Sequence, residues 1–323
     1  MRVGDLDEAA LLARIVPGLP TQALLGPGDD AAVVAAPDGR VVATTDVMVE
    51  FRDFRRDWSS GADVGWKAVA QNVADVAAMG ARCTGLLVAL GLPPELDVAW
   101  VEDFGAGLGQ ACRELGAVVV GGDLSAATEV VVAVTALGDL EGRAPVLRSG
   151  ARVGDVVAVA GSLGGSAAGW DLLRRGHTGA GSPRTAALLA AHRRPVPPVA
   201  AGPAAAGAGA GALMDVSDGL LRDAGRLAAA SGVTIDLRRN GTALGEWVAG
   251  LVAAGVPVEA ADDFVLTGGE DHALLACFPP SVVLPAAYRV VGEVRRAGAA
   301  GVLVDGRPWE GRGTGWDHFA ASS

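Results

Sequence analysis

The sequence predicts an α+β protein of two domains, in which helices pack against mixed or antiparallel sheets. The chain has 323 residues, half of them hydrophobic, which is enough for a sizeable core and, at this length, for two domains. Short β-prone runs alternate with helical stretches, and neighbouring runs are joined both by turns and by helices. A loop-like linker over residues 138–154 interrupts this alternation before it begins again. We therefore expect domains at residues 1–138 and 139–323.

The first half is expected to follow the order β-β-α-β-α-β-β behind a short amino-terminal helix. Its first two strands should form a hairpin, because residues 31–36 and 40–45 are β-prone and Pro37-Asp38-Gly39 is typical of a turn. The other expected elements are helix 7–16, helix 62–79, strand 86–90, helix 98–115, strand 118–120 before Gly121-Gly122-Asp123, and strand 129–137.

The second half begins again with a strand at residues 155–160 and a glycine-rich turn at 161–166. Residues 195–211 are rich in proline, alanine and glycine, so we expect a helix at 199–206 and a flexible loop around it. The other expected elements are helices 167–175, 219–231 and 242–254, and strands 213–216, 233–236, 272–278, 288–294 and 302–304.

The charge balance argues against a nucleic-acid or anionic-membrane surface, because 26 basic residues face 37 acidic ones and the net charge is -11. An anionic substrate stays possible, since bound magnesium can reverse the local sign. The three cysteines are far apart and show no metal-binding or disulfide spacing. The polar start, Met1 to Asp5, does not predict a signal peptide, and no apolar run is long enough to span a membrane. These features predict a cytoplasmic protein.

Acidic residues recur at predicted strand ends and at one helix edge. The predicted hairpin brings the first of them close to the hydroxyls of Thr44 and Thr45. Clustered carboxylates and hydroxyls repel one another unless a cation lies among them, and hard oxygen ligands suit magnesium. The acidic positions are Asp29, Asp30, Asp46, Asp75, Asp123, Asp215 and Asp218.

Each acidic signal also has a purely structural interpretation. Gly28-Asp29-Asp30 and Gly121-Gly122-Asp123 are typical of turns, and Ser217 or Asp218 could cap the helix that follows. Asp75 is harder to explain in this way. It lies on helix 62–79 beside the apolar stripe of that helix, where an unpaired carboxylate is unfavourable. The recurrence of these acidic signals along the chain favours a shared multi-metal centre, and therefore phosphoryl transfer from a nucleotide.

Other phosphate-binding and catalytic patterns are absent. The sequence contains no GxxxxGK[ST] loop, its only lysine, Lys67, lies inside a predicted helix, and protein-kinase signatures are missing. Residues 161–166 are only a weak phosphate loop, since Ser166 could simply cap a helix. The four histidines show no metal spacing, and no Ser/His/Asp or Cys/His arrangement is evident. Arg148 is the best candidate for a phosphate contact, although an arginine in a linker is usually solvated.

Several short motifs follow one another along the chain, namely Gly28-Asp29-Asp30-Ala31-Ala32, Thr44-Thr45-Asp46, Asn72 to Gly80, Gly121-Gly122-Asp123, Arg148-Ser149-Gly150-Ala151, Asp215 to Leu220, Gly268-Gly269-Glu270-Asp271 and Gly315 to Phe319. In this order they resemble the motifs of thiamine-monophosphate kinases, from the amino-terminal helix almost to the last residue. The resemblance implies the two-domain aminoimidazole-ribonucleotide synthetase-like fold and a homodimer joined through the amino-terminal domains. It also implies that ATP and thiamine monophosphate react to give ADP and thiamine diphosphate.

The resemblance further implies three groups of site residues. Magnesium ions would be held by Asp30, Thr44, Thr45, Asp46, Asp75, Asp123, Asp215 and Asp218. ATP would be held by Gly122, Asp123, Arg148 and Ser217. Glu270 and Trp316 would lie at the thiamine end, where an aromatic ring can stack on a cationic one. The acceptor is already a phosphate oxyanion, so we expect in-line transfer with no general base and no phosphoenzyme.

One segment departs from the family pattern. Where the family has a substrate-contacting histidine in a Val-Glu-Gly-Val-His-Phe type of segment, this chain has Val49-Glu50-Phe51-Arg52-Asp53-Phe54. Asp53 therefore stands at the substrate-binding position, and an ionised aspartate cannot donate a hydrogen bond to a phosphate. The missing positive charge could come from Arg52, Arg55 or Arg56.

Two other functions compete with this interpretation. One is a different ATP-dependent enzyme of the same fold. Selenophosphate synthetase would need a reactive amino-terminal cysteine, but none precedes Cys83, and the hydrogenase-maturation relative would need a carboxy-terminal cysteine, but the chain ends in Ser323. The other is a catalytically silent nucleotide-binding protein, in which the retained carboxylates would be a stability burden.

Overall fold

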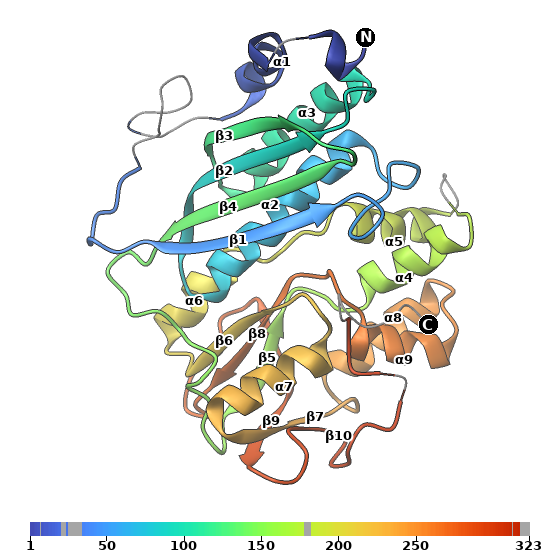
Figure 1. Ribbon diagram of the computed structural model, residues 1–323. Helices are drawn as coiled ribbons and strands as arrows, with labels where there is room; N and C mark the ends of the chain where they lie inside the picture. Colours follow the sequence, from blue (N-terminus) through green and yellow to red (C-terminus); the bar gives the residue numbers. More distant parts are fainter. Residues whose placement is uncertain (7, 21–23, 25–33, 178–181, 312, 317–323) are drawn as a thin grey trace. The chain divides into compact units, whose positions relative to one another are not determined.

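The structure is a computed structural model of the 323-residue chain, and it describes all residues except 7, 21–23, 25–33, 178–181, 312 and 317–323 (Figure 1). It divides into two compact units. The first unit comprises residues 1–76 and 81–142, and the second comprises residues 77–80 and 143–323.

The first unit is built on a four-stranded mixed sheet with the strand order β1-β4-β2-β3. The β1-β4 and β4-β2 pairs are antiparallel, whereas β2 and β3 are parallel and joined through a helix. Helices α2 and α3 cover one face of this sheet (Figure 1). The elements are α1 Glu8–Ile15, β1 Val42–Val49, α2 Gly61–Ala78, β2 Arg82–Leu92, α3 Val98–Leu115, β3 Val119–Ala126 and β4 Val131–Asp139, with short 3-10 helices at Val3–Asp5 and Val16–Gly18.

Side chains of β4 alternate strictly between buried and partly exposed, as expected for a strand with one covered face. Val132, Val134 and Ala136 are buried, and so are Val69 and Val73 of α2. The sequence therefore folds as an amphipathic sheet under two helices, and no described element of the first unit covers its second face.

The second unit contains a six-stranded sheet with the order β10-β7-β9-β5-β8-β6. All pairs are antiparallel except β10-β7, which is parallel. The strands are β5 Val156–Ala160, β6 Ala212–Val216, β7 Val233–Leu237, β8 Ala273–Phe278, β9 Tyr288–Arg296 and β10 Val302–Val304. The helices are α4 Gly165–Arg174, α5 Pro183–Arg193, α6 Ala201–Ala208, α7 Leu220–Ser231, α8 Ala243–Ala253 and α9 Val258–Thr267.

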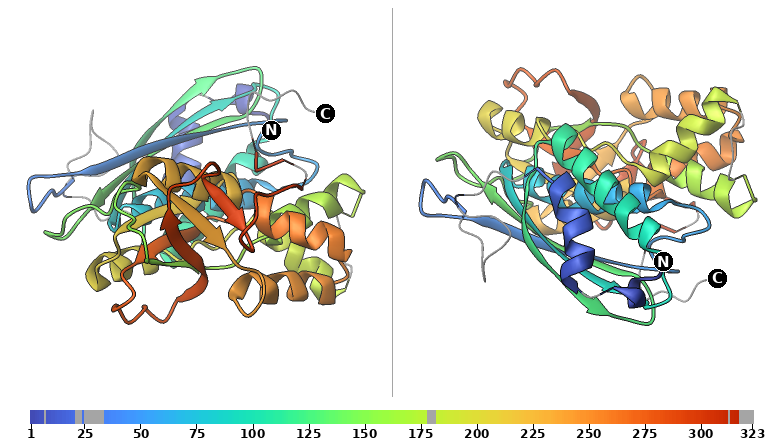
Figure 2. Two further views of the ribbon diagram at one scale, coloured as in Figure 1. Left: turned by 90° about the horizontal axis from the view of Figure 1, so that it is seen from below. Right: turned by 90° about the horizontal axis from the view of Figure 1, so that it is seen from above.

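The central strands of this sheet are buried on both faces. On β8, Leu275 and Cys277 join a large core with the helices α7, α8 and α9, whereas Leu274 and Ala276 join a smaller core with α6. Every residue of β6 and β8 is buried, which explains their continuous apolar runs. Figure 2 draws the ribbon of the chain from two further directions, in which the strands and helices of this unit can be followed by their yellow-green to red colours.

The fold class is the expected one, and most elements lie within a few residues of their predicted bounds. The predicted amino-terminal hairpin is wrong for the described residues. The turn at Pro37–Gly39 forms, with the Gly39 N–H donating to Ala36 O at 3.0 Å, but residues 34–36 are not a strand. Strand β1 pairs instead with β4, almost ninety residues away. A local turn signal could not reveal that long-range pairing.

Two further predictions need correction. Gly121-Gly122-Asp123 does not follow a strand but lies inside β3, paired with residues 87–89 of β2. A Cβ atom added to Gly122 would lie 2.1 Å from the Val88 carbonyl oxygen, so glycine permits this close pairing. Helices α5 and α9 were not predicted.

Among the described residues, no helix is both long and apolar enough to cross a bilayer.

Candidate active site

In the first unit, one side-chain hydrogen bond joins two of the predicted metal ligands. The Thr44 hydroxyl on β1 donates to Asp75 Oδ2 on α2 over 2.8 Å. Asp46 lies two residues along β1 and so faces the same side of the sheet as Thr44. Asp75 is only partly buried, at the edge of the apolar face of α2, as its helical position predicted. A hydroxyl and two carboxylates thus face the helix-covered side of the sheet.

Thr45 and Asp123 lie on the opposite, open face of that sheet. Strand register pairs Asp123 with Ala89, Ala89 with Ala133, and Ala133 with Val47, which is 55% exposed. The Thr45 hydroxyl donates to Val134 O at 3.0 Å and accepts from the Thr135 hydroxyl at 3.2 Å. A single centre that used all five of these predicted ligands would therefore need groups from both faces.

The loop after β1 holds Asp53 in a backbone contact. Its carboxylate accepts the Val49 N–H at 2.8 Å, and the Asp53 N–H donates to Val49 O at 3.0 Å. These two hydrogen bonds show that Asp53 stabilises its own loop. Phe51 in the same loop has a positive φ of 67°, a conformation that glycine adopts more easily.

The arginines of this loop differ in their partners. Arg55 makes a bidentate pair with Asp57 at 2.9 and 2.8 Å, and Arg56 pairs with the buried Glu50 at 2.5 Å. Arg52 is exposed, and no side chain in the described parts of the chain pairs with it.

In the second unit, four predicted site residues come together at the end of β6. The Glu270 N–H donates to Ser217 O at 2.7 Å, and the Trp316 N–H donates to Asp218 O at 2.8 Å. Residues separated by almost a hundred positions are thus held by backbone bonds around the loop between β6 and α7. Arg222 donates to the Trp316 carbonyl and so provides a second contact between these two segments.

A buried carboxylate that the motifs did not single out supports this loop. Asp223 accepts the Asp218 N–H at 3.0 Å, and Arg226 bridges Asp218 and Asp223 with two contacts of 2.7 Å. Burial, followed by the nearby charge of Asp215, raises the pKa of Asp223 to about 6. The signal was present in the sequence, because Asp223 falls in the apolar stripe of α7 beside Leu220, a place where a carboxylate is unusual.

The loop between α9 and β8 carries a second missed group, Asp271. Its two oxygens accept the Gly164 and Ser166 N–H groups at 2.6 and 2.9 Å, so it caps the N-terminus of α4 from outside the helix. Burial raises the pKa of Asp271 to about 7, although these two hydrogen bonds lower it. Both of its neighbours have positive φ, 63° at Glu270 and 52° at His272, which marks a strained loop.

The remaining predicted residues are less informative. Asp215 is buried at the end of β6, and its Oδ2 lies 3.9 Å from His272 Nδ1. Arg148 has an exposed side chain, and its carbonyl accepts the Ser231 hydroxyl at 2.7 Å. Asp30 lies outside the described residues. Within the described ranges, no three His, Cys, Asp or Glu side chains gather closely enough to hold a metal ion.

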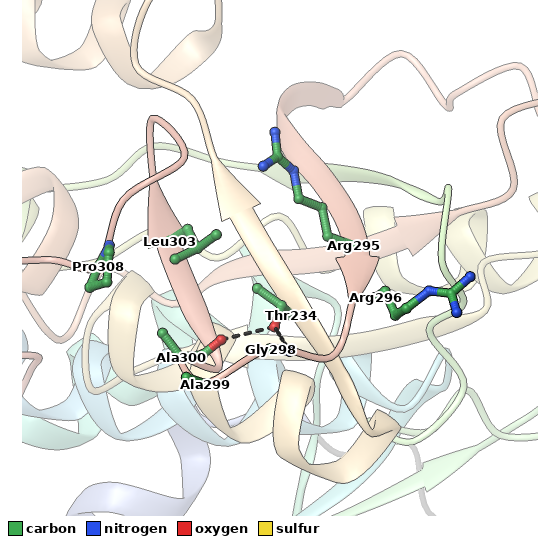
Figure 3. Close-up of a pocket in the computed structure, with 8 residues that line it drawn as sticks. All are labelled: Thr234, Arg295, Arg296, Gly298, Ala299, Ala300, Leu303 and Pro308. Carbon is green, nitrogen blue, oxygen red and sulfur yellow. Dashed lines mark hydrogen bonds between the residues drawn. The ribbon is translucent and has the colours of Figure 1, made fainter.

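A pocket of about 400 Å³ lies elsewhere in the second unit, around β7, β9 and β10 (Figure 3). Its central hydroxyl, Thr234, already donates to Ala300 O at 2.8 Å and accepts the Gly298 N–H at 3.0 Å. Because β10 and β6 are opposite edges of the sheet, this pocket does not contain the acidic residues at the end of β6.

The chain is similar to known proteins over most of its length. Residues 28–140 match the family model "AIR synthase related protein, N-terminal domain", and residues 152–306 match "AIR synthase related protein, C-terminal domain". The chain is 49% identical over 318 residues to a thiamine-monophosphate kinase of Mycobacterium tuberculosis strain H37Rv, covering 98% of this chain and 92% of that protein.

Two solved structures are similar over almost the whole chain. A thiamine-monophosphate kinase from Stenotrophomonas maltophilia has a TM-score of 0.80 and 30% identity, over 94% of this chain and 98% of that one. AaThiL complexed with AMPPCP and TMP has a TM-score of 0.75 and 35% identity, over 98% of both chains.

Proposed function

Because the chain belongs to the thiamine-monophosphate kinase family of AIR synthase related proteins, we propose that it transfers the γ-phosphoryl group of ATP to thiamine monophosphate. The products are ADP and thiamine diphosphate. The observation that carries this proposal is 49% identity along nearly the entire chain. The similarity to AaThiL, whose complex contains AMPPCP and TMP, supports a nucleotide and a second phosphorylated ligand as the pair of substrates.

Magnesium suits the donor set that we assign to the site. The proposed ligands are hard carboxylate and hydroxyl oxygens, namely Asp30, Thr44, Thr45, Asp46, Asp75, Asp123, Asp215 and Asp218. Asp218 already attracts the guanidinium of Arg226 at 2.7 Å, which supports a preference of this carboxylate for positive charge. When bound, Mg²⁺ supplies charge neutralisation between the two anionic substrates.

The chain's own residues orient the substrates in this proposal. Gly122, Asp123, Arg148 and Ser217 bind ATP, and Glu270 and Trp316 bind the cationic, aromatic thiamine end of the acceptor. The acceptor phosphate is already an oxyanion, so no residue needs to remove a proton and transfer proceeds in line. We assign Asp53 to the part of the site that binds the acceptor, because it holds the loop that carries Arg52. The positive charge of Arg52 would bind the phosphate of the acceptor.

The open face of the first sheet supports a homodimer. Val47 is 55% exposed and Leu87 is 38% exposed, and both belong to a face that no element of the first unit covers among the described residues. Pairing two such faces would bury this apolar surface and bring Thr45 and Asp123 to the interface. We assign nucleotide and metal binding and dimerisation to residues 1–138, and completion of the site to residues 139–323.

We also place the protein in the cytoplasm. All three cysteines are free, and Cys112 and Cys277 are buried. Burial raises the pKa of both thiols to about 12, so neither is a reactive thiolate at neutral pH. Free, inert thiols fit a reducing compartment.

The test follows thiamine diphosphate formation from ATP, Mg²⁺ and thiamine monophosphate by chromatography. The Asp75→Asn variant should lose at least about a hundredfold in rate, because it weakens the metal site. The control is Asp97→Asn, which removes an exposed carboxylate paired with Arg2 and should retain the rate within about twofold. Equal rates in the two variants would refute the role of Asp75, and no product from the unaltered protein would refute the acceptor.

A further inference from the structure

His192 lies where helices α4 and α5 pack against each other in the second unit. It is near the end of α5, with only 6% of its surface exposed, and it reaches the first turn of α4. The helices approach closely there, since a Cβ atom added to Gly169 would lie 2.1 Å from Leu188 O and 2.9 Å from His192 Cβ. The imidazole is therefore held in one place by its surroundings.

One ring nitrogen of His192 faces two oxygen atoms. His192 Nδ1 lies 3.1 Å from the buried Ser166 hydroxyl and 3.4 Å from Glu270 Oε2. An ionised carboxylate can only accept a hydrogen bond, so its attraction to this nitrogen requires a hydrogen on Nδ1. The Ser166 hydroxyl, which is the nearer of the two oxygens, can accept the same hydrogen and so competes with Glu270 for it.

The backbone of Glu270 is fixed, but its carboxylate is partly open. Its N–H donates to Ser217 O at 2.7 Å and its φ is 63°, whereas 37% of its side-chain surface is exposed. The next residue, Asp271, caps α4 with both of its oxygens, so helix capping does not use Glu270. Glu270 is thus joined through its backbone to the loop that carries Ser217, while its carboxylate faces His192.

We propose that His192, with Ser166 as its second partner, is a positioning residue that orients the Glu270 carboxylate toward the cationic part of the acceptor. This rests on the proposed function, in which Glu270 binds the thiamine end of thiamine monophosphate. The protein thereby keeps a flexible carboxylate pointing in one direction before the acceptor arrives, which lowers the entropy lost on binding.

The test compares His192→Leu, which removes the ring nitrogen, with His192→Asn, whose amide nitrogen can replace Nδ1 as a donor. His192→Leu should raise the KM for thiamine monophosphate about tenfold, the value of one lost charge-assisted hydrogen bond, and leave the KM for ATP unchanged. His192→Asn should recover most of the loss. Ser166→Ala removes the competing acceptor of the Nδ1 hydrogen and should not raise the KM for thiamine monophosphate.

A double-mutant cycle with Glu270→Gln separates this role from simple packing. The KM effects of His192→Leu and Glu270→Gln should be strongly non-additive, because His192 acts only through the charge of Glu270, which Glu270→Gln removes. Additive effects, or a parallel rise in the KM for ATP, would overturn the proposal. If His192→Leu does not fold, the same cycle is run with His192→Phe, which keeps a ring but has no nitrogen to contact Glu270.

The failure of the proposed function would look different from a failure of this inference. If the unaltered protein neither forms thiamine diphosphate nor binds thiamine monophosphate by calorimetry with AMPPCP and Mg²⁺ present, the proposed function is wrong and this inference falls with it. If the unaltered protein does both while His192→Leu keeps the original KM, only the role of His192 is refuted.

Discussion

Arg52 is distinguished from the other arginines of its loop by the absence of any ion pair in the described chain. Arg55 and Arg56 are already neutralised by Asp57 and Glu50. Replacing Arg52 with alanine should raise the KM for thiamine monophosphate about tenfold and leave the KM for ATP unchanged, because a phosphate would lose one charge-assisted contact. Steady-state kinetics with each substrate varied in turn measures both values.

Arg55→Ala is the matched control for this prediction. It removes an arginine from the same loop, but one whose guanidinium pairs with Asp57 and stacks over Trp58 at 4.8 Å. The KM for thiamine monophosphate should stay within about twofold. Equal effects of the two substitutions would mean that Arg52 has no special part in binding the acceptor.

The elevated pKa of Asp271, about 7, makes stability depend on pH. Because the folded-state pKa lies above the unfolded value, the folded protein binds this proton more tightly. The free energy of unfolding should therefore decrease as the pH rises from about 4 to about 7, and level off above that. Urea unfolding of the protein and of Asp271→Asn isolates the contribution, because the difference between the two should change below about pH 7 and be constant above about pH 8. A difference that stays constant throughout would contradict the pKa.

The candidate site was only partly predictable at the scale of residues. Acidic residues placed after strands, and the order of the motifs, singled out Asp75, Asp218 and Glu270 from the sequence alone. Asp223 and Arg226 were missed although the carboxylate in the apolar stripe of α7 was a signal, because their contact with Asp218 was not visible in the motif. His192 was missed because its partners lie on α4 and on the loop after α9. The assignments to metal and substrates remain predictions.

Gly169 determines how closely the helices α4 and α5 pack against each other. Gly169→Ala should destabilise the protein by about 2 kcal/mol, because its Cβ would meet the Leu188 backbone and the helices would have to separate. Gly250→Ala is the control, since Gly250 lies in α8 with nothing within 4 Å of an added Cβ. That change should stabilise the helix by up to about 1 kcal/mol. Urea unfolding measures both, and a stable Gly169→Ala protein would show that the helices can move apart at little cost.

Elements with strong local signals were predicted well, and those that depend on distant contacts were not. Helix α3 matches its predicted bounds, and the stop signal at Gly116 is real, with a φ of 73°. Helix α5 was missed because only Leu188, Leu189 and His192 on it are buried, which gives little periodicity. The hairpin was wrong because β1 obtains its partner from β4, and no local pattern encodes that pairing.

The open face of the first sheet leads to a prediction for the whole molecule. The protein should be a dimer in solution, and Val47→Glu should dissociate it, because the introduced charge would be buried at the interface. Val283→Glu is the control, since Val283 is 90% exposed in the second unit and should leave the dimer intact. Sedimentation equilibrium gives the mass of each. A monomeric unaltered protein, or dissociation by both substitutions, would contradict the proposed interface.

For the whole molecule, the fold class and the family were predicted from the sequence, because many short motifs in a fixed order constrain both. The strand order β1-β4-β2-β3 was beyond reach, since helices separate strands that become neighbours. Strand alternation alone places Thr44 and Thr45 on opposite faces, but the sequence did not reveal which of these faces the helices cover.

The central claim is direct phosphoryl transfer from ATP to thiamine monophosphate, and one single-turnover experiment tests it. Excess protein is mixed with ATP labelled in its γ-phosphate, Mg²⁺ and thiamine monophosphate, and the label is followed in products and in protein. We predict labelled thiamine diphosphate in a one-to-one ratio with ADP and no labelled protein. Label found only in inorganic phosphate, or attached to the protein during turnover, would contradict direct transfer.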